Sequence, residues 1–132
     1  MIPVSEGNVS SMKEDLFGRC PYVTAQKLLT GKWSMYIIYL LADGPVRFNE
    51  LLRRMPEEMT HTTLSRQLKT LEDRGLVIRK SYAQVPPKVE YSLSEIGTKF
   101  TRILTVLKEL GNDYIEYLQQ NPKDAAQRDT TL

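Results

Sequence analysis

Apolar residues recur at intervals of three and four along four short segments of the first 74 residues. This spacing predicts amphipathic helices over residues 22–30, 33–43, 48–55 and 60–74. A glycine or proline follows each segment and ends the helix there. Only a few residues separate the last two segments, so the pattern predicts a helix, a tight turn and a second helix.

The pattern changes after Gly75. Residues 76–84 and 88–93 are rich in β-branched and aromatic residues, and apolar and polar residues alternate in the second run, so we expect two strands. The link Val85-Pro86-Pro87 lacks two ladder donors and should form an exposed hairpin tip. A final helix is predicted after Ser94. Its apolar positions follow a heptad-like seam through Ile96, Phe100, Ile103, Leu107, Leu110, Tyr114 and Tyr117.

These elements together predict a mainly α fold with a small β-hairpin wing, that is, a winged helix-turn-helix with a long C-terminal dimerisation helix. The chain of 132 residues suits a single domain. We expect that domain to cover residues 20–118, between a flexible N-terminal segment, residues 1–19, and a flexible C-terminal tail, residues 119–132.

Dimerisation is predicted from the width of the C-terminal seam. Further apolar residues flank it, among them Leu104, Val106 and Ile115, which is more apolar surface than one surface helix of a small domain needs. A second copy of the chain would bury the surplus, although both faces packing inside one monomer is the alternative. The residues expected at the dimer contact are Phe100, Ile103, Leu107, Leu110, Tyr114 and Tyr117.

No apolar run approaches the roughly 18 residues that a membrane-spanning helix requires, and the amino terminus has no basic region followed by an apolar stretch. A single cysteine, Cys20, fits a reducing compartment. We therefore expect a cytoplasmic protein.

Positive charge is concentrated in the middle of the chain. The formal net charge is only +2, but residues 45–90 contain nine Lys or Arg against six Asp or Glu, a local net charge of +3.

Thr60 is a good N-cap for the predicted helix of residues 60–74, and the stripe Leu64, Leu68 and Leu71 leaves polar side chains on the opposite face of that helix. Hydroxyls and cations of this kind bind base edges and phosphates.

The residues that we expect to contact double-stranded DNA lie on this helix and on the wing. Arg66 suits a bidentate contact with guanine, and Lys69 suits a phosphate. The wing cations, Arg79, Lys80 and Lys88, project where the DNA backbone would pass. The alternative is that both are ordinary solvated surfaces. The full predicted set is His61, Thr62, Thr63, Ser65, Arg66, Lys69, Arg79, Lys80 and Lys88.

Five motifs between Cys20 and Leu118 resemble the HxlR family of winged-helix transcriptional regulators. They are Cys20-Pro21, the GKW of residues 31–33, DGPVRFNEL of residues 43–51, LSRQLKTLEDRGLV of residues 64–77 and VPPKVEYSLSEIG of residues 85–97. The stretch covers about three quarters of the chain, and the motifs together are far more specific than a generic helix-turn-helix.

The resemblance implies a homodimer that binds palindromic operator DNA, most often as a repressor, with the long C-terminal helix and the first helix supplying the dimer contact. One segment departs from the family pattern: MTHTTL, residues 59–64, stands where members often show an isoleucine-serine-glutamine opening. The base sequence that the helix reads is therefore not carried over from the family.

Cys20 is a candidate redox sensor. It precedes Pro21, which suits the first position of a helix, and a helix N-terminus favours a reactive thiolate. Some proteins of the resembled family use a cysteine of this motif to sense quinones, aldehydes or oxidants. The commoner role of a lone cysteine is that of a small buried hydrophobe.

Other functions find less support in the sequence. Cys20 and His61, the single residues of their kinds, lie 41 positions apart with no evident third catalytic partner, and no glycine-rich phosphate loop or metal-ligand spacing occurs, so we expect neither an enzyme nor a cofactor. A winged helix that binds protein or RNA remains an alternative. Binding of a small aromatic effector is another alternative, with Trp33, Tyr36 and Tyr114 as candidate lining residues. Aromatic residues in such positions more commonly belong to the core.

Overall fold

We describe residues 16–123 from a computed structural model, in which the chain divides after Gly31 into two units. The first unit contains α2 (Pro21–Leu28), which begins after the N-cap Cys20 with Pro21 in its first turn, as predicted. It ends at Leu28, two residues earlier than expected, and buries none of its side chains. The expected flexible segments, residues 1–19 and 119–132, lie mostly outside the described residues.

The second unit is built around three helices, α3 (Ser34–Leu40), α4 (Phe48–Arg54) and α5 (His61–Asp73). Each lies where the apolar spacing predicted a helix. Their apolar stripes meet in a common core, because side chains of all three are completely shielded from solvent. The fully buried residues are Ile37 and Ile38 of α3, Leu51 of α4, and Leu64, Leu68 and Leu71 of α5.

Helix α5 begins where the sequence predicted. The Oγ1 atom of Thr60 accepts a hydrogen bond from the backbone N–H of Thr63 at 3.1 Å, which satisfies one of the unpaired donors of the first turn. At the other end Gly75 adopts a positive φ of 78°, a conformation that favours glycine, and the chain turns into the sheet. Both ends of the helix are therefore fixed by local sequence.

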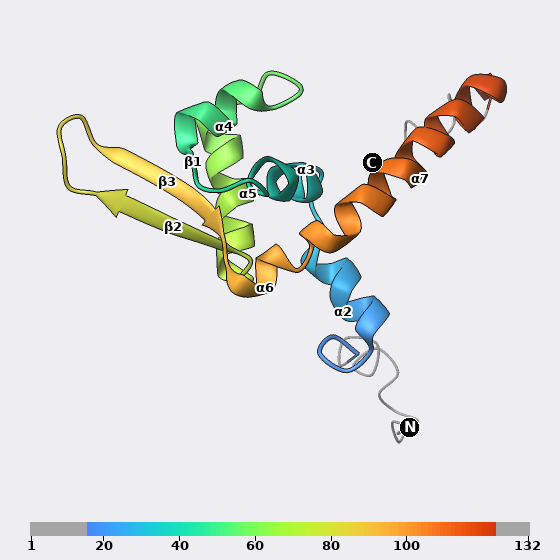
Figure 1. Ribbon diagram of the computed structural model, residues 1–132, viewed down its shortest axis with the longest axis horizontal. Coiled ribbons are helices and arrows are strands. Elements are labelled where there is room, and N and C mark those ends of the chain that lie inside the picture. The colour runs from blue at the N-terminus through green and yellow to red at the C-terminus, as the bar shows by residue number, and fades with distance from the viewer. Residues whose placement is uncertain (1–15, 124–132) are drawn as a thin grey trace. The chain divides into compact units, whose positions relative to one another are not determined.

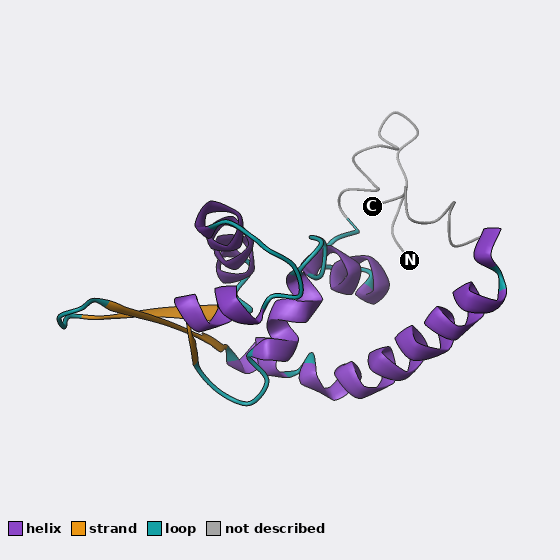
Figure 2. Cartoon of the chain, turned by 90° about the horizontal axis from the view of Figure 1, so that it is seen from above, coloured by secondary structure: helices purple, strands orange, loops and turns teal. Residues whose placement is uncertain are grey.

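The wing is an antiparallel hairpin of β2 (Val77–Tyr82) and β3 (Lys88–Leu93), which projects from the helices (Figures 1 and 2). A third strand, β1 (Val46–Arg47), pairs with β3 and gives the order β1-β3-β2. The sequence did not predict β1, because two residues are too few to show an alternating pattern.

The strand register decides which way each wing side chain points. Arg79 lies opposite Tyr91, and Lys80 lies opposite Glu90, so each pair shares one face of the sheet. Tyr91 is buried, and its ring centroid lies 6.4 Å from that of Phe48 in α4. Arg79 therefore shares the inner face, toward the helices, whereas Lys80 lies on the outer face.

The prediction of one continuous helix after Ser94 is wrong. The chain forms α6 (Glu95–Thr98) and then α7 (Thr101–Gln120), with a turn at residues 99 and 100. The Ser94 side chain caps α6 by accepting from the N–H of Gly97 and also donates to the carbonyl of Gly75 at 2.6 Å. This tertiary contact holds α6 against the base of the wing, and backbone bonds between residues three apart tighten the chain before α7 starts.

Helix α7 is largely exposed, although Leu104, Leu107 and Leu118 are half-buried. It buries no side chain. It projects from the side of the second unit that is opposite the wing (Figures 1 and 2). The large apolar residues that it exposes are Ile103, Val106, Leu110, Tyr114, Ile115 and Tyr117. Among residues 16–123, no helix combines the length and the apolar character needed to cross a bilayer.

Candidate nucleic-acid interface

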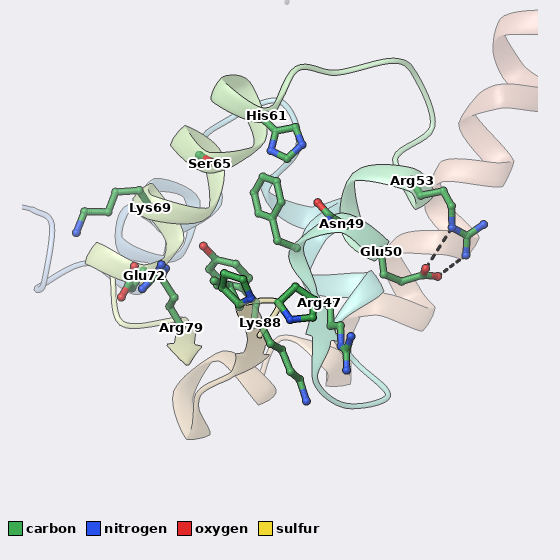
Figure 3. A pocket seen from close by; sticks show the side chains of 15 residues that line it. Arg47, Asn49, Glu50, Arg53, His61, Ser65, Lys69, Glu72, Arg79 and Lys88 are labelled. Atoms are coloured by element: carbon green, nitrogen blue, oxygen red, sulfur yellow. Dashed lines mark hydrogen bonds and ion pairs between the residues drawn. The ribbon is translucent and has the colours of Figure 1, made fainter. Parts of the chain in front are cut away.

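An open groove of about 870 Å³ lies between α5, the start of α4 and the wing (Figure 3). Polar side chains dominate its lining, with five Lys or Arg and two Glu. A basic, open groove of this kind suits a polyanion better than a small apolar ligand. The polar and charged residues that line it are Arg47, Asn49, Glu50, Arg53, His61, Ser65, Lys69, Glu72, Arg79 and Lys88.

Helix α5 presents two neighbouring polar faces. His61, Ser65 and Lys69, four residues apart, line the groove, and the His61 ring lies 4.9 Å from that of Phe48. Thr62 and Arg66 do not line it and are exposed on the adjacent face of the helix. No side chain among residues 16–123 pairs with the Arg66 guanidinium. It therefore retains all its donors for another molecule.

Thr63 has a structural role that the sequence analysis did not assign. Its N–H donates to the Thr60 side chain, and its hydroxyl accepts a hydrogen bond from the Thr60 hydroxyl at 3.0 Å. The side chain is half-buried. Thr63 thus completes the cap of α5, and its neighbours Thr62 and Ser65 are better placed to contact a partner.

The three wing cations do not act from one surface. Arg79 lines the groove on the inner face, and its positive charge is close enough to Lys69 to act against the rise in the pKa of Lys69. Lys80 and Lys88 share the outer face with Tyr82, and their Nζ atoms lie 4.9 and 4.4 Å from its ring centroid. The three residues were predicted as equivalent contacts, but Arg79 and Lys88 line the groove beside α5 and Lys80 does not.

Lys88 is the most enclosed of these cations. Its side chain is only 20% exposed, and its Nζ lies 3.4 Å from a carboxylate oxygen of Glu90. The hydroxyl of Tyr82 donates to the other oxygen of that carboxylate at 3.1 Å. This cluster ties the two strands of the wing together, so Lys88 contributes to the shape of the hairpin as well as to its charge.

Lys69 is held by its own helix. Its Nζ lies 3.1 Å from Asp73, one turn further along α5. The hydrogen bond to Asp73 and the negative charges of Asp73 and Glu72 raise the pKa of Lys69 above its ordinary value of 10.5. The Lys69 side chain is 68% exposed, and such an exposed pair is weak, so a phosphate can replace the Asp73 carboxylate at little cost.

The groove also contains cations that the sequence analysis missed. Arg47 precedes the first residue of α4, and Arg53 lies in its last turn, where it forms hydrogen bonds to Glu50 (Figure 3). Asn49 lies beside them. The first helix of a helix-turn-helix crosses the DNA backbone, which is the signal that would have drawn attention to these residues.

The aromatic residues considered for an effector site do not form one cluster in the structure. Trp33 and Tyr36 are half-buried in the second unit, and their ring centroids lie 6.3 Å apart. Tyr114 instead stacks on Tyr117 at 5.3 Å. Within residues 16–123, no three His, Cys, Asp or Glu side chains are grouped so that they could hold a metal ion.

Comparison with known proteins identifies the family of this chain. The family model of the HxlR-like helix-turn-helix matches residues 28–119, which include α3 to α6, the wing and nearly all of α7. The chain belongs to the HxlR-like helix-turn-helix family. Like other members of the family, it is a DNA-binding transcriptional regulator.

Individual relatives cover most of the chain. A helix-turn-helix transcriptional regulator of Halalkalibacterium halodurans is 50% identical over 106 residues, 80% of this chain and 86% of the relative. The structure resembles that of the redox regulator HypR in its reduced form, with a TM-score of 0.69, 40% identity, and 76% of this chain and 98% of that chain covered. The oxidised form of HypR gives a TM-score of 0.64 at 42% identity, over 71% and 96% of the two chains.

Proposed function

We propose that the chain binds a palindromic operator as a homodimer, with α5 in the major groove and the wing against the backbone or the minor groove. The observation that carries the proposal is the groove itself, where Arg47 of β1 and Arg79 of the wing line the same space as the exposed polar face of α5. We further propose that it acts in the cytoplasm as a repressor, with no catalytic step, because a dimer covering promoter DNA excludes other proteins from it.

Base reading belongs to the N-terminal half of α5 in this proposal. Thr62, Ser65 and Arg66 are exposed there and carry short hydroxyls and a guanidinium. A guanidinium makes a bidentate contact with guanine that discriminates against other bases by about 1–3 kcal/mol. Glu72 and Asp73 lie at the opposite end of the helix, where they would repel phosphates.

Backbone contacts belong to the groove walls. Arg47 and Arg79 both line the groove from strands of the sheet, and neither guanidinium pairs with another side chain among residues 16–123. Each cation that neutralises a phosphate makes binding more dependent on salt. His61 and Lys69 also line the groove and would add to the contact with the DNA backbone.

The dimer contact is proposed for the apolar seam of α7. Leu110 is 61% exposed at its centre, and Ile103, Tyr114 and Tyr117 are also exposed along it. A helix with this much solvent-facing apolar surface is typical of an interface. Two copies related by a two-fold axis would present two α5 helices to successive major grooves of a palindrome.

The test is selection of duplexes from a random-sequence pool by the full chain, followed by anisotropy titrations over a salt series. We expect an enriched palindrome, loss of selectivity at one base pair of each half-site in Arg66→Ala, and a salt slope lower by about one phosphate per subunit in Arg79→Ala. Lys108→Ala, which removes a cation from α7, is the matched control. If wild type and all three variants bind every duplex equally, the proposal is wrong.

A second function, thiol-based sensing, is favoured by one observation. Cys20 is half-buried at the N-cap of α2, so part of its surface is open to solvent. HypR, whose structures resemble this one, is a redox regulator. Alkylation of the thiol should release wild-type protein from DNA and leave Cys20→Ser bound; an alkylated protein that binds DNA unchanged rules sensing out.

A further inference from the structure

The tip of the wing is uncharged and, apart from Gln84, apolar. Five residues without charge, Ala83 to Pro87, connect the strands, and the Val85 side chain at the apex is 99% exposed. Single exposed apolar residues are common on protein surfaces, so exposure alone carries no meaning. The position of Val85 is informative, because Lys80 and Lys88 lie behind it on the outer face of the same hairpin.

The wing is long enough to bring this tip to a neighbouring groove of DNA. Each of its strands has six residues, which corresponds to about 20 Å. Half a turn of duplex, the spacing between a major groove and the next minor groove, is about 17 Å. Pro86 and Pro87 line the same groove as Ser65 of α5, so the tip continues the surface that binds DNA.

The chemistry of the tip suits a particular kind of minor groove. Narrow A-tract grooves attract inserted arginine and lysine, which residues 83–87 lack. Apolar side chains and prolines instead wedge between base steps and partly unstack them. Pro86 and Pro87 have no N–H group, so fewer polar donors lose water when the tip is buried.

We propose that the uncharged wing tip, with Val85 at its apex, enters the minor groove as an apolar wedge and selects operators with a flexible pyrimidine–purine step there. TA and CA/TG steps unstack most easily, so they cost least to open. The inference rests on the DNA-binding function proposed above. It makes Val85 a specificity residue that contacts DNA without reading a base by hydrogen bonds.

The test compares duplexes selected from a random pool by the full-length wild type, Val85→Ala, Val85→Arg and Ile78→Ala. Ile78 is the matched control, because it is also an apolar wing residue, 50% exposed, but lies near the base of the hairpin. We expect wild type and Ile78→Ala to select the flexible step at a fixed distance from each half-site. Val85→Ala should lose this preference, and Val85→Arg should shift it toward A-tracts.

Affinity and salt dependence separate a wedge from a merely structural role. We expect Val85→Ala to bind the selected duplex about three- to tenfold more weakly, with an unchanged salt slope because no phosphate contact is lost. A fluorescent adenine analogue placed at the step should brighten when wild type unstacks it, and stay dark with Val85→Ala.

Three results would overturn the inference. Val85→Ala that selects and binds the wild-type duplexes unchanged shows that the tip does not contact them. A lower salt slope in Val85→Ala shows that Val85 only positions the cations behind it. If the wild type enriches no sequence at all, the DNA-binding proposal falls first and this inference with it.

Discussion

At the scale of single residues, the cations around the groove differ in what already holds them. Arg66, Arg47 and Arg79 have no side-chain partner among residues 16–123, whereas Lys69 pairs with Asp73 and Lys88 with Glu90. A paired cation must exchange its carboxylate for a phosphate, and this exchange costs more where the pair is shielded from water. The unpaired arginines are therefore the strongest candidates for DNA contacts.

Asp73→Asn should strengthen DNA binding. The substitution removes a negative charge from α5 and releases Lys69, whose pKa then returns toward its ordinary value but stays far above neutral pH. Lys69 remains charged and becomes available to a phosphate, so we expect a modestly higher affinity and a steeper salt slope in anisotropy titrations. Asp113→Asn, the same change on α7, is the control. Weaker binding by Asp73→Asn would show that Asp73 positions Lys69 for DNA.

Arg79→Ala and Lys80→Ala should differ although the residues are adjacent. Arg79 faces the groove beside α5, and Lys80 lies on the outer face over the Tyr82 ring. Loss of Arg79 should weaken binding and lower the salt slope by about one phosphate per subunit, while loss of Lys80 should have a smaller effect on both. Equal effects in parallel titrations would contradict the assignment of the two faces.

At the scale of elements, the junction between the wing and the C-terminal helices depends on one glycine. Gly97 in α6 is buried, and a Cβ atom added there would overlap the carbonyl group of Leu76. Helix α6 packs against the wing base only because this position has no side chain.

Gly97→Ala should destabilise the protein by about 1–3 kcal/mol, since the backbone must shift to admit the methyl group. Gly111→Ala in α7 is the matched control, because no described atom lies within 4 Å of its added Cβ. Alanine replaces glycine favourably in a helix by about 0.5–1 kcal/mol, so the two variants should move the midpoint of urea unfolding in opposite directions. Equal midpoints would mean that α6 does not pack closely on Leu76.

At the scale of the whole molecule, the proposed function depends on a second copy of the chain. Each subunit would carry one recognition helix, while the apolar seam of α7 is exposed to solvent in the described chain. Burying that seam would both stabilise α7 and fix the distance between the two helices that read the palindrome.

Leu110→Glu should dissociate the dimer. Leu110 lies in the centre of the seam, and a charge there would be buried without a partner. Lys108→Glu introduces the same residue two positions away, off the seam, and should leave the dimer intact. Sedimentation velocity should therefore show monomers only for Leu110→Glu, which should also bind a full palindrome no better than a half-site. Dimers of Leu110→Glu would place the interface elsewhere.

The sequence by itself determined the elements whose signals are local. Helical apolar spacing located α3, α4 and α5, the hydroxyl of Thr60 marked a true N-cap, and runs of β-branched and aromatic residues located both strands of the wing. Five motifs between Cys20 and Leu118 carried the resemblance to the family. These features depend on neighbours within a few residues, so they can be read along the chain.

Only the tertiary structure decided which side chains face the groove together. The two-residue β1, the break after α6 and the opposite faces of Arg79 and Lys80 follow from contacts between distant segments. Arg47 joins the site because β1 pairs with β3, which no local pattern reveals. Strand register and close packing are set by residues far apart in the sequence, and a shift of one residue would reverse every face.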